Sequence, residues 1–181
     1  MNEGLIPRRY AKALYGFALE KGQAERMYEL MRNVANAFSS APSLQEALGN
    51  PFISSADKQS LLLTASGDGA GDECMLDFMK LLAENHRLNL AHGIALAYID
   101  LYRKERKIYV VNVVSASELK PSEEKRLKDI IMTHLDGGTM EYTGSVDPEL
   151  LGGFVVNINN ERFDASISNE LKQLRLKLLS K

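Results

Sequence analysis

The stretch RKERKIYVVNVV, residues 103–114, decides the fold because the sequence changes character inside it. Its first part is rich in cations, which suit the carboxyl-terminal end of a helix, where the helix dipole is negative. Its second part, 108–114, is rich in β-branched residues and apolar on both faces, as is typical of a buried strand. The sequence therefore predicts a helical domain over residues 1–107 and a domain of alternating strands and helices over residues 108–181.

Upstream of this switch, apolar residues recur at helical spacing along the whole domain. Capping residues, glycines and prolines separate the expected helices from one another. The expected helices are one after Pro7 that ends at Lys21-Gly22, one over 24–38, one from Pro42 to Asn50, one capped by Ser54 or Ser55, one over 72–85 and one after Asn89. The last of them is apolar over much of its circumference and is expected at the centre of a bundle.

Downstream of the switch, strands and helices are expected to alternate. Pro121 is expected to begin a helix with Ser122 as its cap. Period-two patterns predict strands over 140–146 and 154–158, and a return strand over 161–164 after a tight turn at Asn159-Asn160. The residues expected to face the sheet are Leu127, Ile130, Ile131 and Leu135, and those expected on one face of a last helix are Ile167, Leu171, Leu174 and Leu178. The fold class predicted is α+β, an N-terminal six-helix bundle followed by a small α/β C-terminal domain.

The composition is that of an ordinary globular chain, with 45% hydrophobic and 25% charged residues. The formal net charge is −2, so no global field attracts nucleic acid or an anionic membrane. Cys74 is the single cysteine, which excludes an intramolecular disulfide and favours a reducing compartment. The N-terminus lacks a signal-peptide pattern, and apolar stretches such as 94–99 fall far short of the ~20 residues that span a bilayer. A soluble protein is expected, which reaches a membrane only through a partner.

A search for catalytic and metal-binding patterns finds none that fits. The glycine-rich loop over 67–71 follows a helix and lacks the Lys-Ser or Lys-Thr of a nucleotide P-loop. Asp68, Asp72 and Glu73 do not match the ligand positions of a calcium loop, and the three histidines show no close metal-ligand spacing. Cys74 has no histidine nearby in sequence to act as its base, so a buried apolar role explains it better. We therefore expect no enzyme activity, no cofactor and no metal site.

The first and fifth helices carry more apolar surface than one core contact needs. Ala11, Ala13 and Ala18 widen the stripe of the first helix, and Leu76 and Leu81 widen that of the fifth. Periodicity leaves two explanations open. The surplus is covered inside the bundle, or the two helices form a groove that receives a partner's amphipathic helix.

Four stretches, in order over nearly the whole chain, resemble one family. They are RYAKALY at 9–15, FMKLLAENHRL at 78–88, VDPELLGGF at 146–154 and FDASI at 163–167. Together they resemble the motifs of the delta subunits of F-type ATP synthases, the family of the oligomycin sensitivity-conferring protein. Ala165 and Ser168 stand where that family commonly has a glycine and an arginine, which bears on the contacts of the last helix rather than on the family.

The resemblance implies a non-catalytic stator subunit that links the alpha/beta catalytic head to the b-type peripheral stalk, so that rotor torque is resisted and proton flow is coupled to ATP synthesis. It implies that the bundle binds the N-terminal segments of the alpha subunits through its first and fifth helices, and that the C-terminal domain binds the b-type stalk subunits. The residues that it carries over to the first surface are Tyr10, Ala11, Leu14, Phe17, Ala18, Phe78, Leu81, Leu82 and Asn85. The location implied is the cytoplasmic face of the plasma membrane, peripheral and through the complex, with no nucleic acid bound.

Two other functions compete with this interpretation. A helical RNA-binding adaptor of the antitermination type also has a six-helix bundle and an Arg-rich start that resembles Arg8-Arg9. Such an adaptor needs a basic surface, and both the net charge of −2 and the strands expected after residue 107 argue against it. An unrecognised enzyme is disfavoured because no catalytic constellation is present in the sequence.

Overall fold

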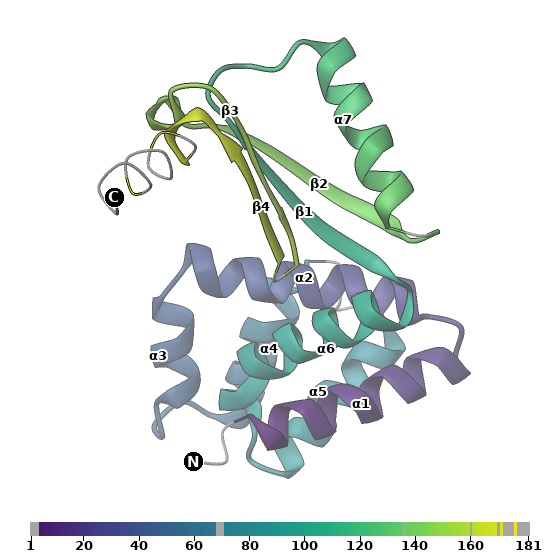
Figure 1. Cartoon of the computed structure of the whole chain (residues 1–181). Helices are drawn as coiled ribbons and strands as arrows, with labels where there is room; N and C mark the ends of the chain where they lie inside the picture. Colours follow the sequence, from purple (N-terminus) through teal and green to yellow (C-terminus); the bar gives the residue numbers. More distant parts are fainter. Residues whose placement is uncertain are drawn as a thin grey trace. The chain divides into compact units, whose positions relative to one another are not determined.

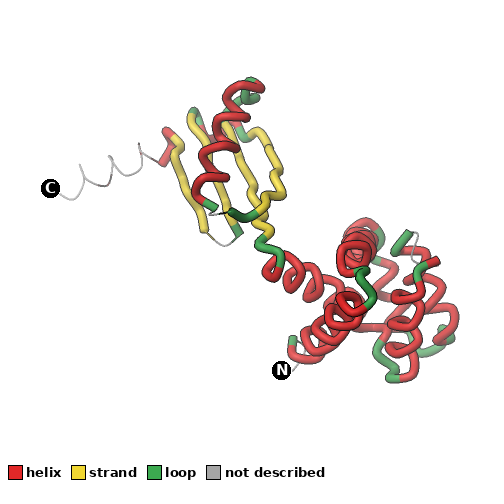
Figure 2. Tube along the Cα trace, turned by 90° about the vertical axis from the view of Figure 1, so that its right-hand side faces the viewer, coloured by secondary structure: helices red, strands yellow, loops and turns green. Residues whose placement is uncertain are grey.

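The structure is a computed structural model that describes residues 4–67, 71–135, 137–159 and 161–169, together with residues 171 and 176. The chain has an α+β fold and divides into two compact units, Met1–Lys104 and Glu105–Lys181. The first unit is helical, and the second contains a four-stranded sheet (Figure 1, Figure 2).

Helices account for the regular structure of the first unit in its described residues. They are α1 (Leu5–Glu20), α2 (Ala24–Ser40), α3 (Ser43–Gly49), α4 (Ser55–Ala65), α5 (Glu73–Glu84), the short 3-10 helix η2 (Leu88–Leu90) and α6 (Ala91–Glu105). α1 begins before Pro7 rather than after it. A proline is tolerated there because the first turn of a helix has no intrahelical partner for the missing N–H.

Three helix boundaries follow the signals in the sequence. Gly22 adopts a left-handed φ of 68° after α1, and the N–H of the next residue donates to the Ala18 carbonyl at 2.8 Å. Ser54 caps α4, since its Oγ accepts from the backbone N–H of Asp57 at 3.1 Å. Asp72 caps α5 in the same way, with 2.9 Å between its Oδ1 and the N–H of Met75. These caps confirm the predicted starts of α4 and α5.

α6 contacts both α1 and α2 and carries part of the core of the first unit. Tyr98 is fully buried, and its O–H donates to the carbonyl of Ala24 at 3.1 Å. Further along the same two helices, the rings of Tyr28 and Tyr102 stack with 4.4 Å between centroids. Near the opposite end of α2, the ring of Phe38 stacks on that of His92 at the start of α6, so the two helices run antiparallel overall. On the other side, Tyr15 of α1 meets Tyr98 edge-on at 6.0 Å.

The second unit is a four-stranded mixed sheet with one helix beside it. Its elements are β1 (Ile108–Ser115), α7 (Pro121–His134), β2 (Thr139–Val146), the 3-10 turn η3 (Pro148–Leu150), β3 (Gly153–Ile158) and β4 (Glu161–Ser166). The strand order is β2-β1-β3-β4. β1 pairs with β2 in parallel and with β3 antiparallel, and β3 pairs with β4 antiparallel.

The core of this unit lies between α7 and one face of the sheet. It contains six buried side chains: Val111, Val113, Ile131, Leu135, Val156 and Ile158. Leu127 packs against this cluster as expected. Ile130 does not, because its side chain is 59% exposed. A helix turns by 100° per residue, so a helix that faces the sheet through Ile131 directs Ile130 away from it. The prediction for Ile130 is therefore wrong.

Ser122 is also not the cap of α7. The residue before the helix is Lys120, and its backbone N–H donates to the carboxylate of Glu123 at 3.0 Å. Pro121 occupies the first helical position, where its fixed φ suits a helix start, so the cap falls one residue before the proline.

Some predictions fall outside the described residues. Leu174 and Leu178 of the last helix, Asn160 of the hairpin turn and Asp68 of the glycine-rich loop belong to this group. Within the described part, Ile167 to Asn169 are helical, and Asn159 has the positive φ of 50° that its turn requires.

Candidate functional site

α1 and α5 lie side by side in opposite directions, and polar contacts link them at both ends. At the carboxyl-terminal end of α1, the Nζ of Lys21 is 3.3 Å from Glu73 and 3.7 Å from Asp77. At the other end of α1, the guanidinium of Arg87 lies over the ring of Tyr10 at 5.9 Å. We call the surface between these two links the α1/α5 seam. Helical spacing places Phe17 on the side of α1 that carries Lys21, and Leu81 and Asn85 on the side of α5 that carries Asp77, so we assign these three residues and Tyr10 to the seam.

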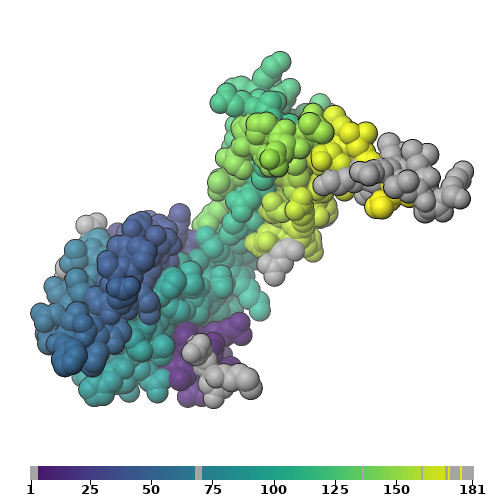
Figure 3. Space-filling model, turned by 90° about the vertical axis from the view of Figure 1, so that its left-hand side faces the viewer, coloured from purple at the N-terminus to yellow at the C-terminus, as the bar shows by residue number. Residues whose placement is uncertain are grey.

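The seam places an apolar row between its two polar ends. Phe17 lies one turn before Lys21, whose Nζ sits over the phenylalanine ring at 4.7 Å from the centroid. Leu81 lies one turn after Asp77 on the facing helix, and it is 42% exposed. Asn85 follows one turn later, and its side-chain N–H donates to the Leu81 carbonyl at 2.7 Å. Part of α1, in purple, is visible at the surface of the unit in Figure 3.

The structure divides the residues predicted for this surface into two groups. Tyr10 and Phe17 are half-buried, and Leu81 and Asn85 are exposed. The other five are core residues that are no more than 5% exposed: Ala11, Leu14, Ala18, Phe78 and Leu82. The helical unit therefore covers most of the apolar stripes of α1 and α5 from within. Only the rim of that stripe is available to another chain.

The sequence does not single out the charged residues of the seam. It identifies Lys21 only as part of a helix end, and Asp77 and Arg87 only as parts of a helix and a motif. Spacing gives one signal that could have found them, since Lys21 is four residues after Phe17 and therefore on the same face of α1. Which residue faces Lys21 on α5 depends on the antiparallel packing and not on the local sequence.

The charges at the seam stabilise the protonated form of Lys21. Burial of the ammonium opposes its charge, but the Glu73 hydrogen bond and the carboxylates of Glu73 and Asp77 outweigh this and raise the pKa of Lys21 above its ordinary value. Cys74 lies beside this cluster on the buried side of α5. Desolvation, with the nearby charge of Asp72, raises the pKa of its thiol to about 11. Such a thiol is not an activated nucleophile.

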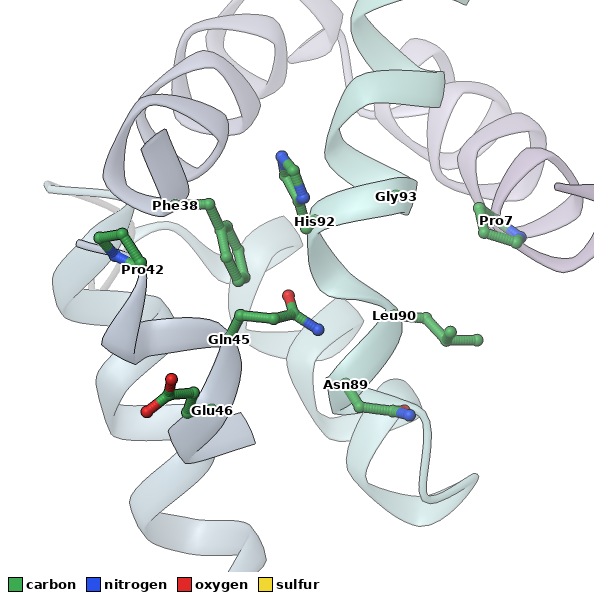
Figure 4. Close-up of a pocket in the computed structure, with 9 residues that line it drawn as sticks. All are labelled: Pro7, Phe38, Pro42, Gln45, Glu46, Asn89, Leu90, His92 and Gly93. Atoms are coloured by element: carbon green, nitrogen blue, oxygen red, sulfur yellow. The ribbon is translucent and has the colours of Figure 1, made fainter. Parts of the chain in front are cut away.

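A hollow elsewhere on the helical unit also lacks a catalytic arrangement among its lining residues. It measures about 730 Å³ and lies between the end of α2, α3 and the start of α6 (Figure 4). Its walls contain the stacked rings of Phe38 and His92, 4.7 Å apart, and a single carboxylate, that of Glu46. Among the described residues, no group of three or more His, Cys, Asp and Glu side chains could hold a metal ion. In the same residues, no helix is long and apolar enough to cross a membrane.

The chain is an α+β protein of two units, and the candidate site on its helical unit is the partly apolar α1/α5 seam. The family model described as "ATP synthase delta (OSCP) subunit" matches residues 6–178. This chain belongs to the ATP synthase delta (OSCP) subunit family. It is 40% identical over 179 residues to ATP synthase subunit delta of Parabacteroides distasonis, covering 99% of this chain and 98% of that one.

Further relatives agree with this family. The delta subunit of Phocaeicola vulgatus is 34% identical to this chain over 180 residues, and the alignment covers 96% of that subunit. A chain in the solved structure of the Toxoplasma gondii mitochondrial ATP synthase hexamer has the same fold, with a TM-score of 0.70 at 22% identity over 96% of this chain. The protein is thus a non-catalytic stator subunit that serves ATP synthesis in the peripheral stalk, and its membrane association comes through the complex. The RNA-binding alternative is not supported.

Proposed function

We propose that this subunit ties the catalytic head to the stalk by binding a different partner with each unit. The six-helix bundle over residues 1–107 binds the N-terminal segments of the alpha subunits, and the domain over 108–181 binds the b-type stalk subunits. The complex holds the protein at the cytoplasmic face of the plasma membrane. Rotor torque on the head is then resisted, and proton flow stays coupled to ATP synthesis.

The α1/α5 seam is the observation that carries the head-binding half of this proposal. Phe17 and Leu81 form an apolar row along two antiparallel helices, and ionic groups flank the row at both ends. An amphipathic helix can lie along such a row with its apolar face against these side chains. The buried residues beneath, such as Leu14 and Phe78, then hold the two helices at a fixed distance.

A stator joint needs affinity and mechanical continuity. A buried aromatic or leucine anchor supplies a large share of the binding energy at an interface, while surrounding contacts exclude water. Tyr10 and Phe17 are half-buried already, so a partner that covers them loses little side-chain entropy on binding. The core beneath the seam is buried, and a close-packed interior has low compressibility and therefore transmits strain.

A titration with a synthetic peptide of the cognate alpha subunit's N-terminal segment tests the seam. Isothermal calorimetry on the full chain is expected to show that Leu81→Asp weakens binding by at least about tenfold, and Phe17→Asp likewise, because a charge replaces an anchor. Leu61→Asp on α4 is the matched control, since Leu61 is 40% exposed against 42% for Leu81. Its affinity for the peptide is expected to equal that of the unaltered chain.

The circular dichroism spectrum and thermal midpoint of each variant separate loss of binding from loss of folding. Equal affinity of Leu81→Asp, Phe17→Asp and Leu61→Asp for the peptide would remove the seam from the proposal.

The stalk half of the proposal is tested by mixing the full chain with b-type subunits and following their co-elution on a size-exclusion column. Deletion of residues 108–181 is expected to abolish co-elution, and retained co-elution would contradict that assignment.

A further inference from the structure

β2 forms one edge of the sheet and is unusually open for an edge strand. It is eight residues long, pairs only with β1 in the described structure, and its one charged residue is Glu141. Proteins usually protect edge strands with lysines, prolines, bulges or a very short length, because unpaired backbone groups bind other strands. β2 has none of these protections. Its exposed edge can therefore receive a further strand.

The backbone groups that face outward can be identified from two hydrogen bonds to the β1 side. The N–H of Thr139 donates to the Lys107 carbonyl at 3.0 Å, and the N–H of Asp147 donates to the Ser115 carbonyl at 2.8 Å. N–H and C=O of one residue point the same way in a strand, and the direction alternates along it. The residues that present both groups outward are therefore Met140, Tyr142, Gly144 and Val146.

The side chains of these same residues lie on the face that α7 covers. Tyr142 pairs with Val111 and Gly144 with Val113, and both valines are buried beneath α7. On this face, beside the edge, there is a hollow of about 410 Å³. Its lining residues are Val113, Ser115, Glu118, Leu119, Glu124, Tyr142, Gly144, Ser145 and Val146.

Gly144 leaves a gap in the row of side chains that would otherwise close this hollow at the edge. The nearest atoms to a Cβ built there belong to the Tyr142 side chain, at 3.5 Å, which is ordinary van der Waals contact. The backbone at Gly144 does not have the positive φ that demands glycine. Neither the conformation nor crowding therefore requires a glycine at this position. The gap instead lets a side chain on an added strand lean inward.

The hollow suits a side chain with an apolar stem and a cationic end. Val113, Leu119 and Val146 provide apolar walls. Glu118 and Glu124 provide carboxylates. Lys128, next to the hollow, shows how a cation is held against Glu124 and Tyr142. Its Nζ is 2.7 Å from Glu124 and 4.1 Å from the centroid of the Tyr142 ring. A second cation finds Glu118 on the same wall.

We propose that the edge of β2 binds an extended, basic segment of a partner chain as a fifth strand, with one lysine or arginine seated in the hollow behind Gly144. Backbone pairing with the outward groups of Met140, Tyr142, Gly144 and Val146 supplies affinity, and the pocket supplies selectivity. This inference does not rest on the helical seam. A second copy of the chain is a poorer occupant, because pairing two β2 edges brings the same acidic groups together.

Nuclear magnetic resonance on the full chain tests the proposal with three capped synthetic peptides. Each alternates threonine and valine, and the central residue is arginine, leucine or glutamate. With the arginine peptide, the amide protons of Tyr142 and Gly144 are expected to shift and to exchange more slowly, while the inward amides of Thr143 and Ser145 change little. The leucine peptide is expected to bind about fivefold more weakly, and the glutamate peptide more weakly still.

Two pairs of variants connect the binding to the structure. Gly144→Val fills the gap and is expected to weaken binding of the arginine peptide about tenfold, whereas Thr143→Val, on the opposite face of β2 and outside the hollow, is expected to leave that binding unchanged. Glu118→Gln is expected to remove the preference for arginine over leucine, and Glu149→Gln, with the same charge change outside the hollow, is expected to keep it. Equal binding of all three peptides, unperturbed outward amides, or dimerisation through β2 in place of peptide binding would overturn the proposal.

Discussion

The two units expose different kinds of surface to a partner. α1 and α5 satisfy their backbone groups within each helix, so the seam presents side chains, chiefly Phe17 and Leu81. β2 instead presents the unpaired backbone of an edge strand, with a glycine where a side chain would stand. A partner of the helical unit is thus selected by the spacing of its apolar anchors. A partner of the sheet unit is selected by its extended backbone conformation and by the one side chain that enters the hollow.

The comparison also shows how each unit uses its apolar residues. In the helical unit, neighbouring elements bury most of the apolar stripe of α1, and Leu14 is only 2% exposed. In the sheet unit α7 packs on one face of the sheet, and Phe163 on β4 remains 47% exposed, with the His134 ring edge-on to it at 5.9 Å. Substitutions in the two units should therefore differ in what they damage.

The largest effect is expected from Leu14→Asp. Burial of an unpaired carboxylate in the core is expected to lower the free energy of unfolding of the helical unit by about 4 kcal/mol or more. Leu19→Asp on the same helix, at a position 46% exposed, is expected to stay within about 0.5 kcal/mol. Urea denaturation followed by circular dichroism measures both. Equal stability of the two variants would mean that Leu14 is not a core residue.

A pair of glycine substitutions is expected to act with opposite signs in the two units. Gly153 at the start of β3 has a φ of 78°, and a Cβ there would overlap the Ala165 carbonyl of β4, so Gly153→Ala is expected to cost about 2–3 kcal/mol. Gly16 lies within α1 with nothing within 4 Å of a built Cβ, so Gly16→Ala is expected to stabilise by about 0.5–1 kcal/mol. Amide exchange in each unit reports the two changes in stability separately. Destabilisation by both substitutions would contradict the expected difference in sign.

Alkaline pH is expected to weaken the helical unit first. Cys74 is buried, and its folded-state pKa of about 11 lies above the ordinary value of 9.0. The unfolded chain therefore loses this proton before the folded chain does, so the stabilising contribution is complete below pH 9 and is lost as pH rises towards 11. The expected slope is up to about 1.4 kcal/mol per pH unit.

Cys74→Ala provides the control for this pH dependence. Its free energy of unfolding is expected to fall less steeply over the same window, because the titrating thiol is gone. Tyr98 contributes in the same direction, since desolvation, with the nearby charge of Cys74, raises the pKa of its phenol. An identical slope with and without the thiol would assign the effect to other groups of this unit, such as Tyr98 and Lys21, and not to Cys74.

Much of the fold could be predicted from the sequence because its signals are local. The caps at Ser54 and Asp72 and the exit at Gly22 follow from residue chemistry within four positions. The surface could be predicted less well. Periodicity shows that Leu14 and Leu81 both lie on apolar stripes, but it does not show how many neighbours cover each one, and only Leu81 is exposed. The hollow behind Gly144 depends on strand register and could not be seen in the local pattern.

The smallest change in stability is expected from removing a serine near the start of one helix in each unit. Ser54→Ala removes the acceptor for the Asp57 N–H at the start of α4 and is expected to cost about 1 kcal/mol. Ser122→Ala is expected to change stability by less than about 0.3 kcal/mol, because Ser122 follows Pro121 inside α7 and Glu123 makes the hydrogen bond at that end. Thermal denaturation of both variants measures the difference. A loss at Ser122 equal to that at Ser54 would restore the cap that the sequence suggested, and it would mean that Glu123 does not fix the start of α7.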